Sequence, residues 1–199
     1  MKLLIRVIIA SLILGITSWV IIQLPSVQDR LIVVAFTALG SASNNLPKED
    51  ALSAAVCGSR SPLPSPGRAE TCILITAGDD LFVVDIGDGS NDNLRSWNIN
   101  FRDIEAVLIT HLHSDHIADL PGLHQNAWVV GERSSKLKVF GPEGIDQFTQ
   151  GIEMAYAHDY VFRNEHHGDA IAPLEYAGFD TNVIAVSYTH LTLPTNREV

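Results

Sequence analysis

Three imidazoles and one carboxylate stand close together in the stretch Thr110-His111-Leu112-His113-Ser114-Asp115-His116. Imidazole nitrogen and carboxylate oxygen, with no thiolate among them, suit zinc and its neighbours in the transition series. His111 and His113 alternate, so in extended backbone both rings point to the same side of the chain. The spacing therefore predicts a metal site with four protein ligands: His111, His113, Asp115 and His116.

The same four ligands favour two metal ions over one. Four protein ligands would close a single zinc site, whereas a catalytic zinc keeps one position open for water. Asp115 and His116 are adjacent, which makes it difficult for both to reach the ion held by His111 and His113. The alternative is a set of solvated loop histidines without metal. It requires a chance match to His-x-His-x-Asp-His, on the order of one in a million per window at average residue frequencies.

The flanking residues place this stretch between a strand and a helix. Residues 105–109 are apolar and β-branched, which predicts a buried strand, and residues 117–120 predict the opening of a helix. We expect Asp115 and His116 where the chain turns between the two. The ligands would then lie on a loop that a rigid scaffold positions.

The remaining pattern predicts an α/β domain whose sheets are covered by helices. Further strands are expected at residues 52–57, 71–76, 81–85, 136–140 and 182–186, with the second and third forming a hairpin. Helices are expected up to Trp97, capped by Ser90 and Asn91, and at residues 144–162, while residues 120–123 interrupt the helix that follows the metal loop. Residues 165–168 predict an exposed turn. Four histidines outside the loop are not expected to bind metal: His124, His158, His166 and His167.

Three motifs together resemble a known family, the metallo-β-lactamase-fold hydrolases. His111-Leu112-His113-Ser114-Asp115-His116 is similar to that family's metal-binding motif, and Val83-Val84-Asp85-Ile86-Gly87 looks like its strand ending in Asp-x-Gly. Residues 57–68, rich in Ser and Pro, look like the Gly-Ser-Pro loop of the ribonuclease Z and arylsulfatase-like branch. Arg60 departs from the glycine usual in that branch. The resemblance runs from about residue 52 to about residue 186.

This resemblance implies a four-layer αββα sandwich, of which the chain would contain the N-terminal half. It implies two zinc ions per full-length domain at the edge between the sheets. It also implies further ligands, two His and a bridging Asp, later than the metal loop. Asp85 would support the site by orienting a ligand or loop, with an ordinary turn aspartate as the alternative.

The implied activity is zinc-dependent hydrolysis of a phosphodiester or related ester by a metal-bound hydroxide, with Asp115 as a catalytic residue that orients the nucleophile. The alternatives are hydrolysis of a lactone, thioester or sulfate ester, or a non-catalytic, membrane-tethered metal-binding fragment. The chain carries 13 Lys and Arg against 23 Asp and Glu, a formal net charge of −10. Because phosphate backbones need cations, this charge favours a small anionic or neutral ester over nucleic acid.

The N-terminal residues 1–24 predict a signal anchor or transmembrane helix. Lys2 and Arg6 precede an uncharged run at residues 7–24, long enough to span a bilayer. Basic residues before the run favour an N-terminus inside and a domain outside the cytoplasm, either periplasmic or on the cell surface. Secretion after signal cleavage is the alternative. Residues 25–50 form a juxtamembrane segment and linker, in which residues 31–40 either lie on the membrane or pack on the domain.

Two further predictions concern the cysteines and the tail. Cys57 and Cys72 both fall in predicted strands; they either pair in an oxidising compartment or remain buried small apolar residues, the second being slightly favoured. Residues 187–199 look like the translation of a sequencing-library adapter, so we expect a non-native tail after a partial domain at residues 51–186. His190 would then stand at a ligand position by coincidence. We expect this chain alone to be inactive as a hydrolase and its full-length parent to be active.

Overall fold

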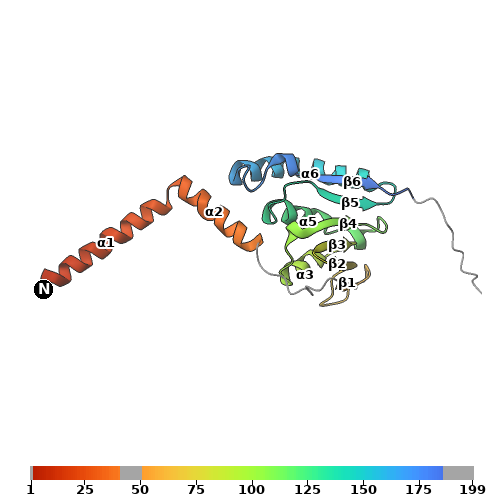
Figure 1. Ribbon diagram of the computed structural model, residues 1–199, viewed down its shortest axis with the longest axis horizontal. Coiled ribbons are helices and arrows are strands. Elements are labelled where there is room, and N and C mark those ends of the chain that lie inside the picture. The colour runs from red at the N-terminus through yellow and green to blue at the C-terminus, as the bar shows by residue number, and fades with distance from the viewer. Residues whose placement is uncertain (1, 41–50, 186–199) are drawn as a thin grey trace, which may run out of the picture.

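The structure, a computed structural model, describes residues 2–40 and 51–185 (Figure 1). Two helices, α1 (Lys2–Ile22) and α2 (Pro25–Gly40), extend from an α/β domain. The backbone of helix α2 comes close to a π-helical segment of the domain, η2 (Asn126–Val130), while Leu31 and Val34 of the helix are exposed. The predicted linker at residues 41–50, the tail at residues 187–199 and His190 lie outside the described residues.

One six-stranded sheet forms the centre of the domain, in the order β1-β2-β3-β4-β5-β6. Its strands are β1 (Leu52–Gly58), β2 (Cys72–Ala77), β3 (Asp80–Val84), β4 (Ile104–Leu108), β5 (Leu137–Gly141) and β6 (Phe179–Val183). Strands β1 to β3 pair antiparallel, including the predicted hairpin, and β3 to β6 pair parallel. Parallel neighbours need crossover connections, which place helical segments between them.

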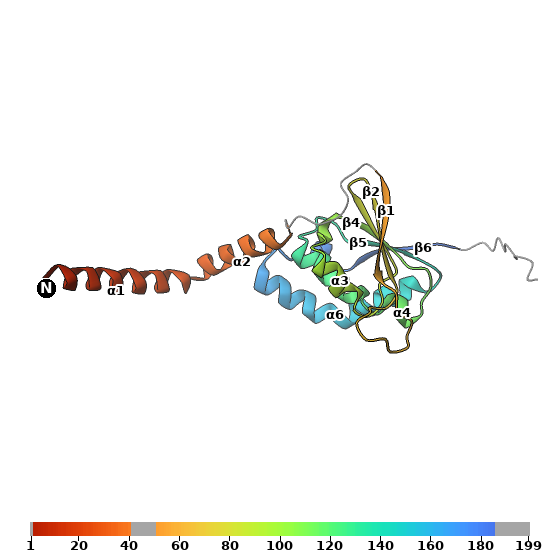
Figure 2. The same cartoon turned by 90° about the horizontal axis from the view of Figure 1, so that it is seen from below.

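The helical connections lie on one side of this sheet (Figure 2). They are α3 (Ser90–Ser96), α4 (Ser114–Ile117), α5 (Leu120–Gln125) with η2, and α6 (Ile145–His167), with short 3-10 turns η1 (Phe101–Asp103) and η3 (Leu174–Tyr176). Sheet and helices together confirm the predicted mixed α/β fold.

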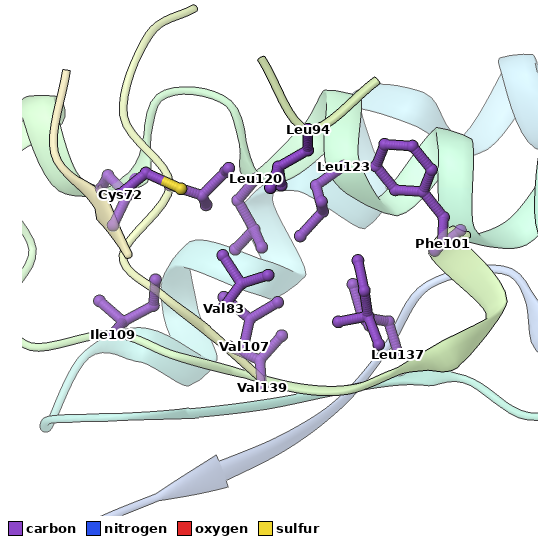
Figure 3. Close-up of a cluster of buried hydrophobic side chains, with 14 of the residues drawn as sticks. Cys72, Val83, Leu94, Phe101, Val107, Ile109, Leu120, Leu123, Leu137 and Val139 are labelled. Carbon is purple, nitrogen blue, oxygen red and sulfur yellow. The ribbon is translucent and has the colours of Figure 1, made fainter. Parts of the chain in front are cut away.

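The core fills the space between the sheet and these helices. Val83, Val107 and Val139 come from three neighbouring strands and lie against Leu120 and Leu123 of α5, all of them fully buried (Figure 3). On the opposite face of the sheet, Val56 is 63% and Ile73 is 37% exposed. Alternating side chains therefore give the described sheet one buried face and one face that leaves apolar side chains of β1 and β2 exposed.

Two helix predictions are wrong at their ends. Helix α6 continues to His167, so residues 165–167 form its last turn rather than an exposed turn, and Gly168, with φ 77°, ends it. Residues 120–123 begin α5 instead of interrupting a helix. Pro121 lies in the first turn, where its missing N–H costs no hydrogen bond.

The predicted cap of α3 is also wrong. Its N-cap is Gly89, and neither Ser90 nor Asn91 caps the helix with its side chain. The Ser90 hydroxyl donates instead to the backbone oxygen of Glu70 at 2.8 Å. A long-range acceptor therefore competes successfully for a residue type that favours helix starts.

Strand β6 begins three residues before its predicted start, because Phe179 is buried in the core and pairs with Leu137 of β5. Cys57 and Cys72 form a disulfide between β1 and the start of β2, and both are buried. The slight preference for unpaired cysteines is wrong. Antiparallel pairing of β1 with β2 brings the two residues together across a separation of 15 positions.

Candidate metal centre

The metal loop leaves the carboxyl end of β4, where ligands of open α/β sheets commonly bind. Backbone bonds fix its start on both sides: the Asp85 N–H donates to Leu108 O at 2.9 Å, and the Ile109 N–H donates to Phe140 O at 2.7 Å. Asp85 directly follows β3, and Phe140 belongs to β5. Three neighbouring strands therefore hold the first residue of the loop, Thr110.

His111 and His113 form a first pair of donors. Nε2 of His111 lies 3.1 Å from Nδ1 of His113, and the two rings meet edge to face. Two nitrogens bound to one tetrahedral zinc at 2.0–2.1 Å lie about 3.3 Å apart. The alternation seen in the sequence thus brings these two nitrogens to the spacing of ligands on a single ion.

Asp115 and His116 form a second pair, with Asp115 Oδ2 3.6 Å from His116 Nε2. Both belong to α4, whose N-cap is His113, so the expectation that they stand in a turn before the helix is wrong. Their side chains are only 10% and 16% exposed. The helix aims both groups back towards the loop, and the rings of His111 and His116 lie 4.0 Å apart.

Asp85 is buried and contacts the second pair. Its Oδ2 lies 2.7 Å from Nδ1 of His116, and its Oδ1 accepts the Thr110 backbone N–H at 2.8 Å. Its φ of 56° lies in the left-handed region, which few residues other than glycine adopt. Asp85 is therefore placed where a carboxylate that orients a metal-binding imidazole would lie.

Gly87 lets the chain after Asp85 lie directly against α4. A Cβ at Gly87 would stand 2.1 Å from the backbone oxygen of Asp115, closer than any side chain allows. The neighbouring Ile86 N–H donates to His116 O at 2.8 Å. These contacts set the position of the helix that carries the second pair.

Arg60, in the Ser- and Pro-rich loop at residues 57–68, forms ion pairs with residues near Gly87. Its guanidinium lies 3.3 Å from Glu70 Oε1 and 3.1 Å from Asp88 Oδ2. Glu70 Oε2 in turn accepts the Asp88 N–H at 3.1 Å. The departure from the glycine usual in the resembling branch thus creates an ion-pair cluster beside Gly87.

The structure does not bring the other histidines to the metal loop. His124 is 1% exposed, accepts the Gly178 N–H on Nε2 at 3.2 Å and lies among aromatic rings of Trp128 and Phe179. Burial lowers the pKa of His124 to about 4, with the cations Lys136 and Arg133 adding to the effect. His124 is a neutral core residue.

Three more histidines lie on α6. His158 stacks on Phe162 with ring centroids 6.2 Å apart, and His166 and His167 meet in the last turn of the helix. Neither of these ring contacts involves the metal loop.

Thr110 is the site residue that the sequence pattern did not single out. It directly precedes His111, and its hydroxyl lies 2.8 Å from Asp85 Oδ2. The sequence does show that Thr110 is a polar residue between an apolar strand and the first ligand. It does not show that Asp85 lies opposite Thr110.

The donors fit zinc as two half-sites. Across residues 2–40 and 51–185, no three His, Cys, Asp or Glu side chains converge tightly enough to form one metal site. They converge as two pairs, one made of two imidazole nitrogens and the other of an imidazole nitrogen and a carboxylate oxygen, all of them donors that zinc accepts. The residues present therefore fit two ligands of each of two ions.

Comparison with known proteins extends these observations. The family model of the metallo-beta-lactamase superfamily matches residues 65–191. Ribonuclease Z from Mycobacterium bovis (strain BCG / Pasteur 1173P2) is 36% identical over 118 residues, which are 58% of this chain and 42% of that protein. Ribonuclease Z from Mycobacterium sp. (strain KMS) is 37% identical over 117 residues, covering 58% and 41%. The chain thus spans less than half the length of these relatives.

A solved structure shares the fold. The short form of human tRNase Z superposes with a TM-score of 0.50 at 20% identity, covering 66% of this chain and 44% of that one. At this identity the likeness concerns the fold alone. Since the family model covers well over half of the chain and includes the metal loop, the chain belongs to the metallo-beta-lactamase superfamily.

Proposed function

We propose that this segment belongs to a zinc-dependent hydrolase that cleaves a phosphodiester or related ester. The observation that carries the proposal is the 3.1 Å spacing of His111 Nε2 and His113 Nδ1, beside the Asp115 and His116 pair. Similarity to proteins named ribonuclease Z supports phosphodiester cleavage. Because the chain covers 42% of the first of these relatives, the activity is proposed for a protein of their full length.

Each residue of the centre has a proposed role. His111 and His113 would hold one zinc ion, and Asp115 and His116 would hold a second. Bound zinc supplies Lewis acidity and lowers the pKa of water to about 7. The Asp115 carboxylate would accept a hydrogen bond from the attacking water and so orient it.

For the substrate we propose a small anionic or neutral ester. The support is the net charge of −10, since a protein that neutralises many phosphates needs a surface rich in Lys and Arg. RNA is the second candidate, favoured by the names of the relatives. Lactone, thioester and sulfate-ester hydrolysis remain alternatives, as does a metal-binding fragment without turnover.

We also propose that α1 anchors the domain in a membrane, with the domain outside the cytoplasm. The segment Ile5–Ile22 is long and apolar enough to span a bilayer, and none of it is buried within the described structure. A signal sequence passes the same test, so cleavage and secretion are the alternative. The Cys57–Cys72 disulfide supports an oxidising compartment under either arrangement.

Zinc content tests the proposed centre directly. A protein of the relatives' length that contains this segment should bind zinc, and His111→Ala and His113→Ala should each remove it from the first pair. His158→Ala, which changes a histidine on α6 away from the loop, is the matched control. A wild-type protein of that length that binds no zinc, or unchanged zinc content in both loop variants, would refute the assignment.

Hydrolysis is tested in a protein of the relatives' length that contains this segment. Zinc-dependent cleavage of bis-p-nitrophenyl phosphate, lost in His111→Ala, is the expected result. Exclusive cleavage of precursor tRNA would replace the small ester with RNA. About two zinc ions per protein without turnover of any of these esters would favour the metal-binding alternative.

A further inference from the structure

The hydroxyl of Thr110 lies between the two ligand pairs and contacts groups of both. Thr110 Oγ1 is 2.8 Å from Asp85 Oδ2, 3.1 Å from His111 Nδ1 and 3.5 Å from His116 Nδ1. The backbone N–H of Thr110 donates to the other Asp85 oxygen at 2.8 Å. Asp85 therefore bonds to both the backbone N–H and the hydroxyl of Thr110, which fixes the direction of the Thr110 side chain.

The donors and acceptors around this hydroxyl leave one consistent arrangement. A carboxylate only accepts, so the single proton of the Thr110 hydroxyl donates to Asp85 Oδ2. The oxygen of Thr110 then has lone pairs left, and one of them accepts the proton on His111 Nδ1 at 3.1 Å. A neutral imidazole protonated on Nδ1 carries its free lone pair on Nε2.

That free nitrogen is the one that faces the first metal position. His111 Nε2 is the atom 3.1 Å from His113 Nδ1. The same reasoning applies to the second pair, where Asp85 Oδ2 accepts the hydrogen bond from His116 Nδ1 at 2.7 Å. The lone pair of His116 Nε2, which lies 3.6 Å from Asp115 Oδ2, is then available to a metal ion. One carboxylate thus sets the tautomer of one imidazole in each pair.

We propose that Thr110 is a positioning residue of the metal centre, which relays the Asp85 carboxylate to His111 while Asp85 contacts His116 directly. A metal-binding histidine is commonly held by a hydrogen bond from its other ring nitrogen, which fixes the tautomer and the ring orientation. The inference rests on the proposed zinc function for its purpose, whereas the hydrogen bonds exist in the chain without metal.

The tautomers of the metal-free chain test the relay without reference to activity. Nitrogen-15 NMR of the histidine rings, recorded on the 199-residue chain in detergent, should show His111 protonated on Nδ1. Thr110→Val keeps the side-chain shape but removes the hydroxyl, so His111 should lose this preference, and Thr110→Ser should restore it. An unchanged His111 tautomer in Thr110→Val would overturn the proposal.

Zinc affinity of a protein of the relatives' length that contains this segment, measured by competition with a chelator, is the second readout. Thr110→Val should bind zinc about 10- to 100-fold more weakly than the wild type, because loss of a hydrogen bond to a metal ligand commonly lowers metal affinity by that factor. Thr149→Val is the matched control, because Thr149 is a buried threonine of α6 whose hydroxyl bonds to Ile145 O and Thr181, away from the loop. Equal losses in Thr110→Val and Thr149→Val would also overturn the proposal.

Asp85→Asn interrupts the relay at its other end and is examined with the same spectra. It should disturb both His111 and His116, whereas Thr110→Val should disturb mainly His111. If Thr110→Val fails to melt cooperatively, Thr110→Ser and Asp85→Asn decide the question. A wild-type protein of the relatives' length that shows the expected tautomers but binds no zinc would refute the proposed function and leave the positioning role intact.

Discussion

Nδ1 of His116 lies 2.7 Å from Oδ2 of Asp85, a residue 31 positions earlier in the chain. One residue follows β3 and the other belongs to α4, so only the parallel pairing of β3 with β4 brings them together. The contact joins two of the three motifs that carry the family resemblance.

Replacing Asp85 by Asn should weaken zinc binding about 10- to 100-fold, because the amide cannot accept hydrogen bonds on both of its terminal atoms. Asn tolerates the left-handed backbone at this position better than most residues, so the fold should be retained. Chelator competition measures the effect. Asp180→Asn, at an exposed position of β6, is the control and should leave zinc affinity unchanged. Equal affinities in the two variants would contradict the supporting role.

Adding a methyl group at Gly87 should lower stability and disturb α4, since the new Cβ would stand 2.1 Å from Asp115 O. Overpacking of this kind commonly costs about 1–3 kcal/mol. Gly151→Ala gives the contrast, because nothing lies within 4 Å of its Cβ position and it is inside α6. That change should stabilise the protein by about 0.5–1 kcal/mol. Denaturant unfolding of both variants measures the difference. A Gly87→Ala variant as stable as the wild type would show that the segment around Gly87 can shift away from α4.

His124 should make the protein less stable as pH falls. Its pKa is about 4 in the folded protein and 6.5 in an ordinary environment, so the unfolded chain binds the proton more readily. The stability from the neutral ring is therefore complete above pH 6.5 and is lost as pH decreases towards 4, at up to about 1.4 kcal/mol per pH unit. His124→Gln can still accept from the Gly178 N–H but does not titrate.

Unfolding at a series of pH values between 7.5 and 4.5 checks this. The difference in unfolding free energy between wild type and His124→Gln should shrink with falling pH. His158→Gln, on the outer part of α6, should run parallel to the wild type. If the His124→Gln and wild-type curves were parallel, the buried neutral ring would not contribute to acid sensitivity.

Reducing the Cys57–Cys72 disulfide should destabilise the domain. Opening a loop closed across 15 positions costs about 3 kcal/mol in the chain-entropy description. The melting temperature should fall on addition of dithiothreitol, whereas the double variant Cys57→Ala and Cys72→Ala should melt low with or without reductant. A wild type that melts alike in both conditions would indicate that the two thiols are not bonded in solution.

The N-terminal helix should hold the intact chain in membranes. After expression, the protein should stay in the pellet through a carbonate wash and enter solution only with detergent, because Ile5–Ile22 exposes apolar side chains on all sides. Intact-mass measurement separates the alternative, since a cleaved signal would shorten the chain. Uncleaved protein in a detergent-free soluble extract would rule out the anchor.

The sequence by itself determined the elements with strong local patterns and the residue types of the site. Apolar runs around residues 81–85 and 105–109 predicted β3 and β4 within about a residue, because strand burial leaves a local record. Alternation predicted that the rings of His111 and His113 lie on one side. The motif predicted a metal site and the family, since few other chemistries require that spacing.

Tertiary structure decided what depends on distant partners. The Ser90 hydroxyl donates to Glu70 O instead of capping α3, and Cys72 forms a disulfide with Cys57 across a strand pair. Strand β6 starts earlier than expected because Phe179 is buried in the core. The relay from Asp85 through Thr110 to His111 has the same origin. Hydrogen-bond partners 20 or more residues apart are chosen by sheet register and packing, and neither leaves a periodic trace in the neighbouring residues.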